Sequence, residues 1–223
     1  MQITHLGHSC LLVEAAGRRL LIDPGTFSDV AVVRDLDAIL VTHQHPDHID
    51  PAILPQLLAD SPAARLWLEP GAADTVAEAE PQLDKYIGRM QRGSVIDLDG
   101  LSITPVGDRH AVIHDYVPRI DNLGLVVQGD GEPSLFHPGD ALDAEDATFG
   151  EVDLLCVPVN APWARVADTV GFVRRIAPGR VVPIHDGLLN DTGRQMYLGH
   201  IQRFGADGGI EVLDLRDQGP VDV

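Results

Sequence analysis

A short histidine-rich segment carries the strongest chemical signal in the sequence. It reads Thr-His-Gln-His-Pro-Asp-His and places His43, His45, Asp47 and His48 close together. Neutral imidazole nitrogens bind zinc and related ions well, and a carboxylate supplies negative charge. Residues of an extended chain point to alternate sides, so His43 and His45 can face one ion together. Asp47 and His48 come after Pro46, where the chain must turn, and can face a second ion.

Two ions need more ligands than this segment offers, and other residues that follow predicted strands can supply them. His110, Asp140 and His185 come after predicted strands at Leu101–Val106, Ser134–Phe136 and Val181–Ile184. Ligands at the ends of several strands would converge at one edge of the sheets. His114 competes with His110 for the third histidine of the first ion, and the sequence leaves both open.

The elements that must position these residues alternate between strands and helices. Besides the strands above, the pattern predicts strands at Ser9–Ala15, Arg19–Ile22, Ala38–Val41, Arg65–Leu68, Val95–Leu98, Leu123–Val127 and Leu154–Val157. It predicts helices at Pro51–Ala59, Ala72–Glu80, Val166–Ile176 and Thr192–Phe204. Asp99-Gly100 and Gly129-Asp130-Gly131 suit tight hairpin turns. This order favours an α/β fold, a four-layer αββα sandwich of two mixed β-sheets, in a single domain over residues 1–223.

Composition narrows the class of protein further. The chain has 223 residues, two cysteines and a formal net charge of −18. Cys10 and Cys156 lie in apolar runs, and we expect them to be reduced and buried, as in a cytoplasmic protein. The N-terminus does not read as a signal peptide, and no apolar run is long enough to span a membrane. The strong acidity argues against nucleic acid as a partner.

Several motifs together resemble the metallo-β-lactamase fold superfamily. The matching residues are Gly7-His8-Ser9, Ile22-Asp23-Pro24, the segment His43 to His48, Pro138-Gly139-Asp140 and Pro183-Ile184-His185-Asp186-Gly187. Within the superfamily, the chain looks most similar to the branch of L-ascorbate-6-phosphate lactonases and related metal-dependent hydrolases. The resemblance spans almost the whole chain, and the histidine segment is its most specific part.

The resemblance implies a two-metal site and a ligand set for it. His43, His45 and His110 would hold one divalent ion, Asp47, His48 and His185 the other, and Asp140 would bridge them. The ligands suit zinc best, and manganese or iron would also fit. Such a site could use a metal-bridging hydroxide to cleave a small ester, lactone or phosphoester, with Asp47 and Asp140 as its catalytic carboxylates.

Residues around the ligands are expected to support them. Metal-bound histidines usually donate their other ring N–H to a carboxylate or carbonyl group. Asp23 is predicted to brace the histidine segment in this way. His8 can either line the pocket or be a hydrogen-bonded buried histidine. Position alone favours a supporting role for Asn122, His137 and Asp186.

Two other functions compete with hydrolysis of a small molecule. A phosphodiesterase or nuclease can be built on the same fold, and so can a metal-binding protein without hydrolytic turnover, such as a sensor or a redox protein. Net acidity argues against the nuclease. The sequence therefore predicts a small-molecule substrate, with no nucleic acid and no membrane as partners.

Overall fold

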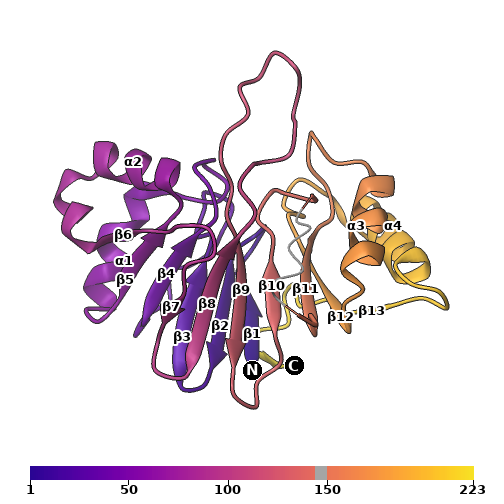
Figure 1. Cartoon of the computed structure of the whole chain (residues 1–223), viewed down its shortest axis with the longest axis horizontal. Helices are drawn as coiled ribbons and strands as arrows, with labels where there is room; N and C mark the ends of the chain where they lie inside the picture. The colour runs from indigo at the N-terminus through magenta and orange to yellow at the C-terminus, as the bar shows by residue number, and fades with distance from the viewer. Residues whose placement is uncertain (144–149) are drawn as a thin grey trace.

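Two β-sheets packed face to face form the centre of the protein (Figure 1). The structure is a computed structural model that describes residues 1–143 and 150–223. Each sheet has seven strands within the described residues. The first has the order β14-β1-β2-β3-β4-β5-β6, and the second the order β13-β12-β11-β10-β9-β8-β7.

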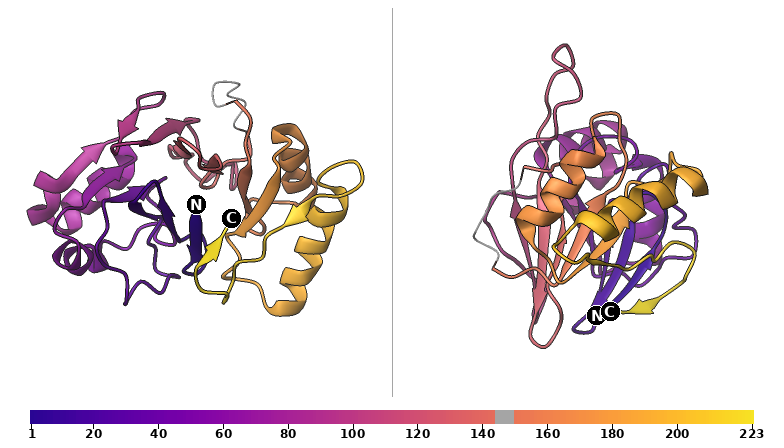
Figure 2. Two further views of the ribbon diagram at one scale, coloured as in Figure 1. Left: turned by 90° about the horizontal axis from the view of Figure 1, so that it is seen from below. Right: turned by 90° about the vertical axis from the view of Figure 1, so that its right-hand side faces the viewer.

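The first sheet comes almost entirely from the N-terminal part of the chain. Its strands are β1 (Gln2–His5), β2 (Leu11–Ala15), β3 (Arg18–Ile22), β4 (Ala38–Val41), β5 (Arg65–Leu68), β6 (Ile87–Arg89) and β14 (Val221–Asp222). β14 pairs with β1 and so brings the two ends of the chain side by side (Figure 2). From β3 to β6 neighbouring strands run parallel, so the loops that follow β3 and β4 leave the same edge of the sheet.

The second sheet repeats this plan with the later strands. They are β7 (Ile96–Asp97), β8 (Leu101–Val106), β9 (Gly124–Gly129), β10 (Leu135–His137), β11 (Leu154–Pro158), β12 (Arg180–Ile184) and β13 (Glu211–Val212). β10 to β13 are parallel, and β7 to β10 form antiparallel hairpins. Asp99 and Gly100 both have positive φ at the β7–β8 turn, as the predicted hairpin requires.

Helices cover the outer faces of both sheets. α1 (Leu54–Asp60), preceded by a 3-10 turn at Pro51–Ile53, and α2 (Pro70–Ala79) lie on the first sheet, and a second 3-10 stretch, Pro81–Tyr86, leads into β6. α3 (Val166–Ile176) and α4 (Asp191–Phe204) lie on the second sheet. In the described part of the chain, no helix is both long and apolar enough to pass through a membrane.

Three apolar cores hold the four layers together. The central core joins the facing sides of the sheets, and it includes Leu20 from the first sheet and Leu125 and Cys156 from the second. A second core packs the first sheet against α1 and α2, and a third packs the second sheet against α3 and α4. The predicted four-layer αββα arrangement is confirmed. Cys10 and Cys156 are free and buried as expected, and burial raises the pKa of both thiols.

Most element boundaries agree with the sequence prediction, and the differences have local causes. The strand expected from Ser9 begins at Leu11, because residues 7–10 form a turn closed by a hydrogen bond from the Cys10 N–H to the Gly7 carbonyl. The helix expected over 51–59 begins as a 3-10 turn, with Asp50 accepting a hydrogen bond from the Ala52 N–H.

Gly25 lets two loops approach each other at the edge of the first sheet. A Cβ atom at Gly25 would lie 2.0 Å from the carbonyl carbon and oxygen of Asp47 and 2.5 Å from the backbone nitrogen of His48. These are backbone atoms and cannot swing away as a flexible side chain would. The loop after β3 can therefore support the histidine segment only with glycine at this position.

We expect Gly25→Ala to lower the free energy of unfolding by about 1–3 kcal/mol, because the added methyl group must push the histidine segment outward. Gly171→Ala is the matched control. Gly171 is exposed on α3 with nothing within 4 Å of the added Cβ, so alanine should raise stability by about 0.5–1 kcal/mol. Chemical denaturation of both variants measures the difference. Equal effects of the two substitutions would contradict the close approach.

Candidate metal centre

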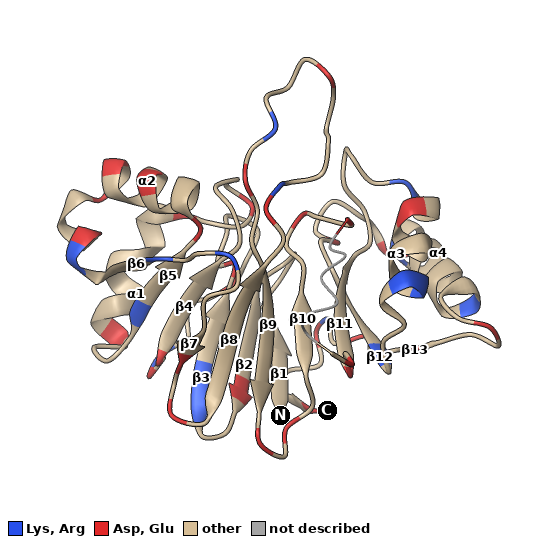
Figure 3. Ribbon diagram, viewed as in Figure 1, with Lys and Arg blue, Asp and Glu red and all other residues tan. Residues whose placement is uncertain are grey.

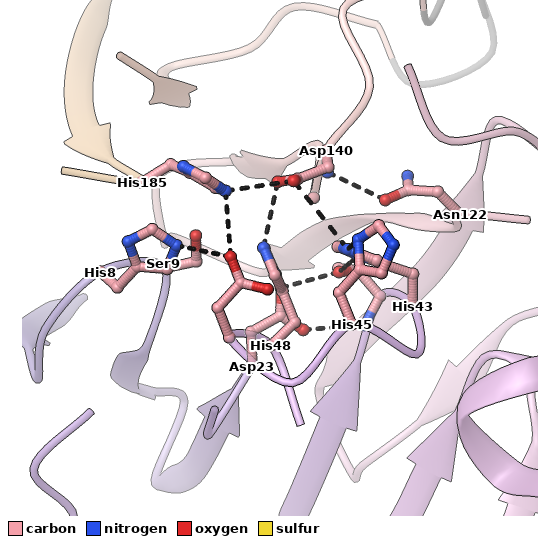
Figure 4. A network of polar contacts seen from close by, with 12 residues as sticks. His8, Ser9, Asp23, His43, His45, His48, Asn122, Asp140 and His185 are labelled. Carbon is pink, nitrogen blue, oxygen red and sulfur yellow. Dashed lines mark hydrogen bonds and ion pairs between the residues drawn. The ribbon is translucent and has the colours of Figure 1, made fainter. Parts of the chain in front are cut away.

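Two groups of potential metal ligands meet at the edge of the sheets where β4, β8, β10 and β12 end (Figure 4). One group consists of His43, His45, His110 and Asp140, and the other of His8, Asp47, His48 and His185. Within each group, the nitrogen and oxygen atoms that could bind an ion lie within 4.8 Å of one another. All seven residues predicted as ligands are thus brought together, and the structure adds His8.

Asp140 belongs to the first group and also contacts the second. Its Oδ2 atom is 3.1 Å from His185 Nε2, 3.4 Å from His110 Nε2 and 4.0 Å from His43 Nε2. Its Oδ1 atom is 3.1 Å from His48 Nε2. A carboxylate in this position can contact two ions at once, which is the role that the resemblance implies for Asp140.

Hydrogen bonds to Nδ1 fix the tautomer of the buried histidines around Asp140. His48 Nδ1 donates to Asp23 Oδ2 at 2.7 Å, since a carboxylate can only accept. His110 Nδ1 donates to the Ala111 carbonyl at 2.6 Å, and His185 Nδ1 to the Asn160 carbonyl at 2.7 Å. In the neutral ring the other nitrogen, Nε2, then carries a free lone pair.

His43 has the same tautomer through a two-step chain. The Thr42 hydroxyl donates to Asp23 Oδ2 at 2.7 Å and so accepts from His43 Nδ1 at 3.0 Å. His43 Nε2 then faces His45 Nδ1 at 3.2 Å. His45 is half-buried and presents its Nδ1 atom to the group.

The converging lone pairs leave buried polar atoms that a divalent cation would satisfy. Nε2 of His48, His110 and His185 and Oδ1 of Asp140 are buried and have no hydrogen-bond partner. Burying such atoms unpaired costs about 1–3 kcal/mol each. Imidazole nitrogens and carboxylate oxygens are the donors that zinc and related ions accept. The chemistry and placement of these residues therefore fit divalent metal ions.

The charges around Asp140 also favour a cation in the centre. Burial lowers the pKa of His48, but the carboxylates of Asp140 and Asp23 outweigh it and hold this pKa well above its usual value. Burial also lowers the pKa of His185, but the Asp140 carboxylate outweighs this effect and raises the pKa above its usual value. Burial lowers the pKa of His43 well below normal and keeps this ring neutral. The residues around Asp140 thus combine a neutral ring, His43, with a carboxylate that attracts positive charge.

Asp23 braces the histidine segment, as the sequence predicted. Its side chain is fully buried and accepts hydrogen bonds from the Thr42 backbone N–H at 2.8 Å, from the Thr42 hydroxyl and from His48 Nδ1. One carboxylate after β3 therefore sets both the path of the chain after β4 and the orientation of His48.

Two of the three residues expected in a supporting role, Asn122 and His137, hold the loop that carries Asp140. The Asn122 side chain accepts a hydrogen bond from the Asp140 N–H and donates to the Pro138 carbonyl, both at 2.9 Å. His137 Nδ1 accepts from the Gly139 N–H, while its Nε2 donates to the Ser9 carbonyl. Asp186 is buried and paired with Arg194 at 2.6 Å. None of the three belongs to the two ligand groups.

The structure resolves the choice between the two candidate histidines. His110 is buried and lies in the first group, held by its backbone N–H to the Ile120 carbonyl. His114 is exposed on the tip of the same loop, where its Nδ1 accepts from the Tyr116 N–H.

Trp163 is a further residue of the site, and its side chain contacts Asp140. Its indole N–H donates to Asp140 Oδ2 at 3.2 Å, and its ring lies 5.8 Å from His110 and 6.1 Å from His185 between centroids. It comes from the loop after β11, far from the ligands in the sequence. No local motif surrounds it, so only the packing of this loop over the site identifies it.

Comparison with known proteins agrees with the fold. Residues 2–185 match the family model described as β-lactamase superfamily domain. Protein Rv0786c from Mycobacterium tuberculosis is 43% identical over 204 residues, which cover 90% of this chain and 91% of the relative. A UPF0173 metal-dependent hydrolase from Azorhizobium caulinodans is 30% identical over 213 residues, covering 84% and 86% of the two chains.

A solved structure shows the same fold at lower sequence identity. Igni18, described as a metallo hydrolase from the archaeon Ignicoccus hospitalis, superimposes with a TM-score of 0.73. The match covers 100% of this chain and 98% of the other at 19% identity. The fold predicted from the resemblance, a metallo-β-lactamase fold, is thereby confirmed.

The two loop histidines give a direct test of the first ligand group. We expect His110→Ala to weaken binding of one zinc ion by more than about tenfold, because a buried ring nitrogen is lost from the group. His114→Ala should leave zinc binding unchanged, since its ring is exposed outside both groups. Titration with zinc against a chromophoric chelator measures both variants. Weaker binding in His114→Ala than in His110→Ala would reverse the assignment.

Proposed function

The chain belongs to the metallo-β-lactamase superfamily, and we propose that it is a metal-dependent hydrolase of small organic esters or lactones. The observation that carries this proposal is the pair of ligand groups around Asp140, with imidazole lone pairs converging on its carboxylate. Relatives described as metal-dependent hydrolases support it.

We assign the ligands of two divalent ions from these two groups. His43, His45 and His110 would hold the first ion, Asp47, His48 and His185 the second, and Asp140 would contact both. Nitrogen and carboxylate ligands in this ratio suit zinc, and manganese or iron would also be accepted.

The chemistry divides between the ions and the side chains. When bound, the ions supply an activated water and positive charge for the oxyanion that develops in hydrolysis. Asp140 is 2% exposed and keeps the negative charge between the ligand groups. Asp47 has a side chain that is 25% exposed, so it can also meet a water molecule that enters from solvent. We therefore assign Asp47 the second role of orienting the attacking water.

Charge favours a small substrate over a polyanion. Two divalent ions would more than balance the carboxylates of Asp47 and Asp140 and leave a positive centre for an oxyanion or a single anionic group. The protein as a whole carries a net charge of −18. Figure 3 shows its Lys and Arg residues scattered over separate elements. A long polyanion would be repelled as it approaches, whereas a small neutral or singly charged molecule would not.

The loop that carries His110 offers an apolar surface beside the site. It rises away from the sheets between β8 and β9 (Figure 1), and Val112, Ile113, Tyr116 and Val117 are exposed along its tip. Exposed apolar groups gathered next to a site are typical of ligand contact surfaces. We expect the substrate to combine its ester or lactone group with an apolar part.

Metal content is the first test of this proposal. We expect about two transition-metal ions per chain in protein purified without chelator, because six ligands surround one shared carboxylate. Elemental analysis by mass spectrometry gives the number. A content near zero that added zinc or manganese does not raise would contradict the two-metal site.

We expect Asp47→Ala to abolish turnover, by about a hundredfold or more, while the fold remains intact. The carboxylate lies on a loop at the edge of the sheet, so its removal opens no apolar core. Asp130→Ala, in the exposed turn between β9 and β10, is the control and should keep full activity. Rates are compared at matched metal content. Wild-type turnover in Asp47→Ala would remove this residue from the site.

A hydrolysis panel tests the substrate class. We expect measurable hydrolysis of small lactones or esters, faster with an apolar acyl chain, and little cleavage of single-stranded RNA. Added salt should change kcat/KM for the small substrate only modestly, because long-range attraction contributes little to its binding. RNA cleavage with steep inhibition by salt, and no activity on small esters or lactones, would favour a nuclease instead.

A further inference from the structure

His8 sits against the second ligand group but differs from its histidines. It follows β1 in the turn at residues 7–9, is 1% exposed, and has a positive φ of 53°. Its ring packs 4.0 Å from the ring of His185 and 5.1 Å from that of Phe27, between centroids. The ring is therefore held on both sides and cannot turn freely.

The backbone fixes the tautomer of His8 in the opposite sense from that of the assigned ligands. The Gly187 N–H donates to His8 Nδ1 at 3.1 Å, so this nitrogen carries the lone pair. The proton of the neutral ring is then on Nε2, which lies 3.1 Å from Asp47 Oδ2 and donates to it. In His48 and His185 the proton is on Nδ1, and Nε2 is free.

We infer that His8 is not a metal ligand but a positioning residue, which holds the Asp47 carboxylate in place for the second ion. The inference rests on the proposed function, since it assigns a role toward the metal that Asp47 would bind. An Nε2 atom that carries a proton cannot also offer a lone pair to an ion, although it lies within ligand distance of the group.

Asp47 needs such support because of where it lies. It is the more exposed carboxylate of the two, and it stands on the turn after Pro46. Its Oδ2 atom lies 3.6 Å from His185 Nε2, where an ion would have to fit. Without a fixed donor the side chain could rotate into solvent. The hydrogen bond from His8 holds the Asp47 side chain toward His185.

The far side of His8 restricts which substitutions can test this role. His8 also lines a cavity of about 720 Å³ with Phe27, Asp186, Gly187 and Arg216 among its walls. Within the described residues, no other member of the two ligand groups lines this cavity. Truncation to alanine would join the cavity to the site, so the substitutions must keep the volume and the polarity of the ring.

Asparagine and glutamine separate the two hydrogen bonds of His8. In His8→Asn the amide oxygen replaces Nδ1 and still accepts from the Gly187 N–H, but no donor reaches Asp47. In His8→Gln the amide nitrogen replaces Nε2 and can still donate to Asp47. Asparagine tolerates the left-handed backbone better than glutamine, so backbone strain would work against the expected order.

The experiment measures zinc affinity of the full chain by competition with a chromophoric chelator, with thermal unfolding to verify folding. We expect His8→Asn to weaken binding of the second zinc ion by about 10–100-fold and to leave binding of the first ion unchanged. His8→Gln should stay within about threefold of the wild type, as should the control His200→Asn, at an exposed position on α4.

Two results would overturn the inference. Equal loss of the second ion in folded His8→Asn and His8→Gln would mean that the ring itself binds metal. Wild-type affinity in His8→Asn would mean that Asp47 needs no support from His8. A wild-type protein that binds no zinc would give a different pattern, because it would overturn the proposed function and, with it, this role.

Discussion

The buried carboxylate of Asp23 is the interaction on which the site depends. An unpaired charge in this position would be costly, and here three donors from the next strand and loop compensate it. The backbone N–H of Thr42 fixes where the chain leaves β4. The hydroxyl of Thr42 also accepts a hydrogen bond from His43 Nδ1 and so orients that ring. The third donor to Asp23 is His48 Nδ1. Because the same carboxylate orients one histidine of each ligand group, the distance between the groups is set by the sheet rather than by a flexible loop.

The fold keeps several residues of this edge in an uncommon backbone conformation. His8, Asp23 and His185 all have positive φ, between 49° and 58°, although none is glycine. Such a conformation costs of order 1 kcal/mol or more at each residue, and persists only where the surroundings determine it. Here the surroundings are the ends of strands inside two packed sheets, together with backbone bonds such as that from the His185 N–H to the His8 carbonyl. At these three residues the strained backbone lies where the side chains converge, and the packed sheets hold it in this conformation.

The sequence predicted the parts that depend on local order and missed those that depend on tertiary pairing. β4, β5, β8 and α3 lie at the predicted residues, since each has an uninterrupted strand or helix pattern. β6, β13 and β14 are two or three residues long and exist only because a neighbouring strand pairs with them. The histidine segment was predictable because its spacing is itself the signal. Trp163 was not, because its contact with Asp140 joins two loops that no spacing relates.

Residue type alone does not say what a histidine at this edge does, and the backbone supplies the missing information. His8 and His185 both lie close to the same Asp47 oxygen, and both are buried. They differ in the partner of Nδ1. In His185 it is the Asn160 carbonyl, from the loop after β11, and in His8 it is the Gly187 N–H, from the loop after β12. A carbonyl partner leaves Nε2 free for an ion, and an N–H partner turns Nε2 into a donor for a carboxylate. The division of work within the site therefore follows from the direction of two peptide groups, which sequence motifs do not encode.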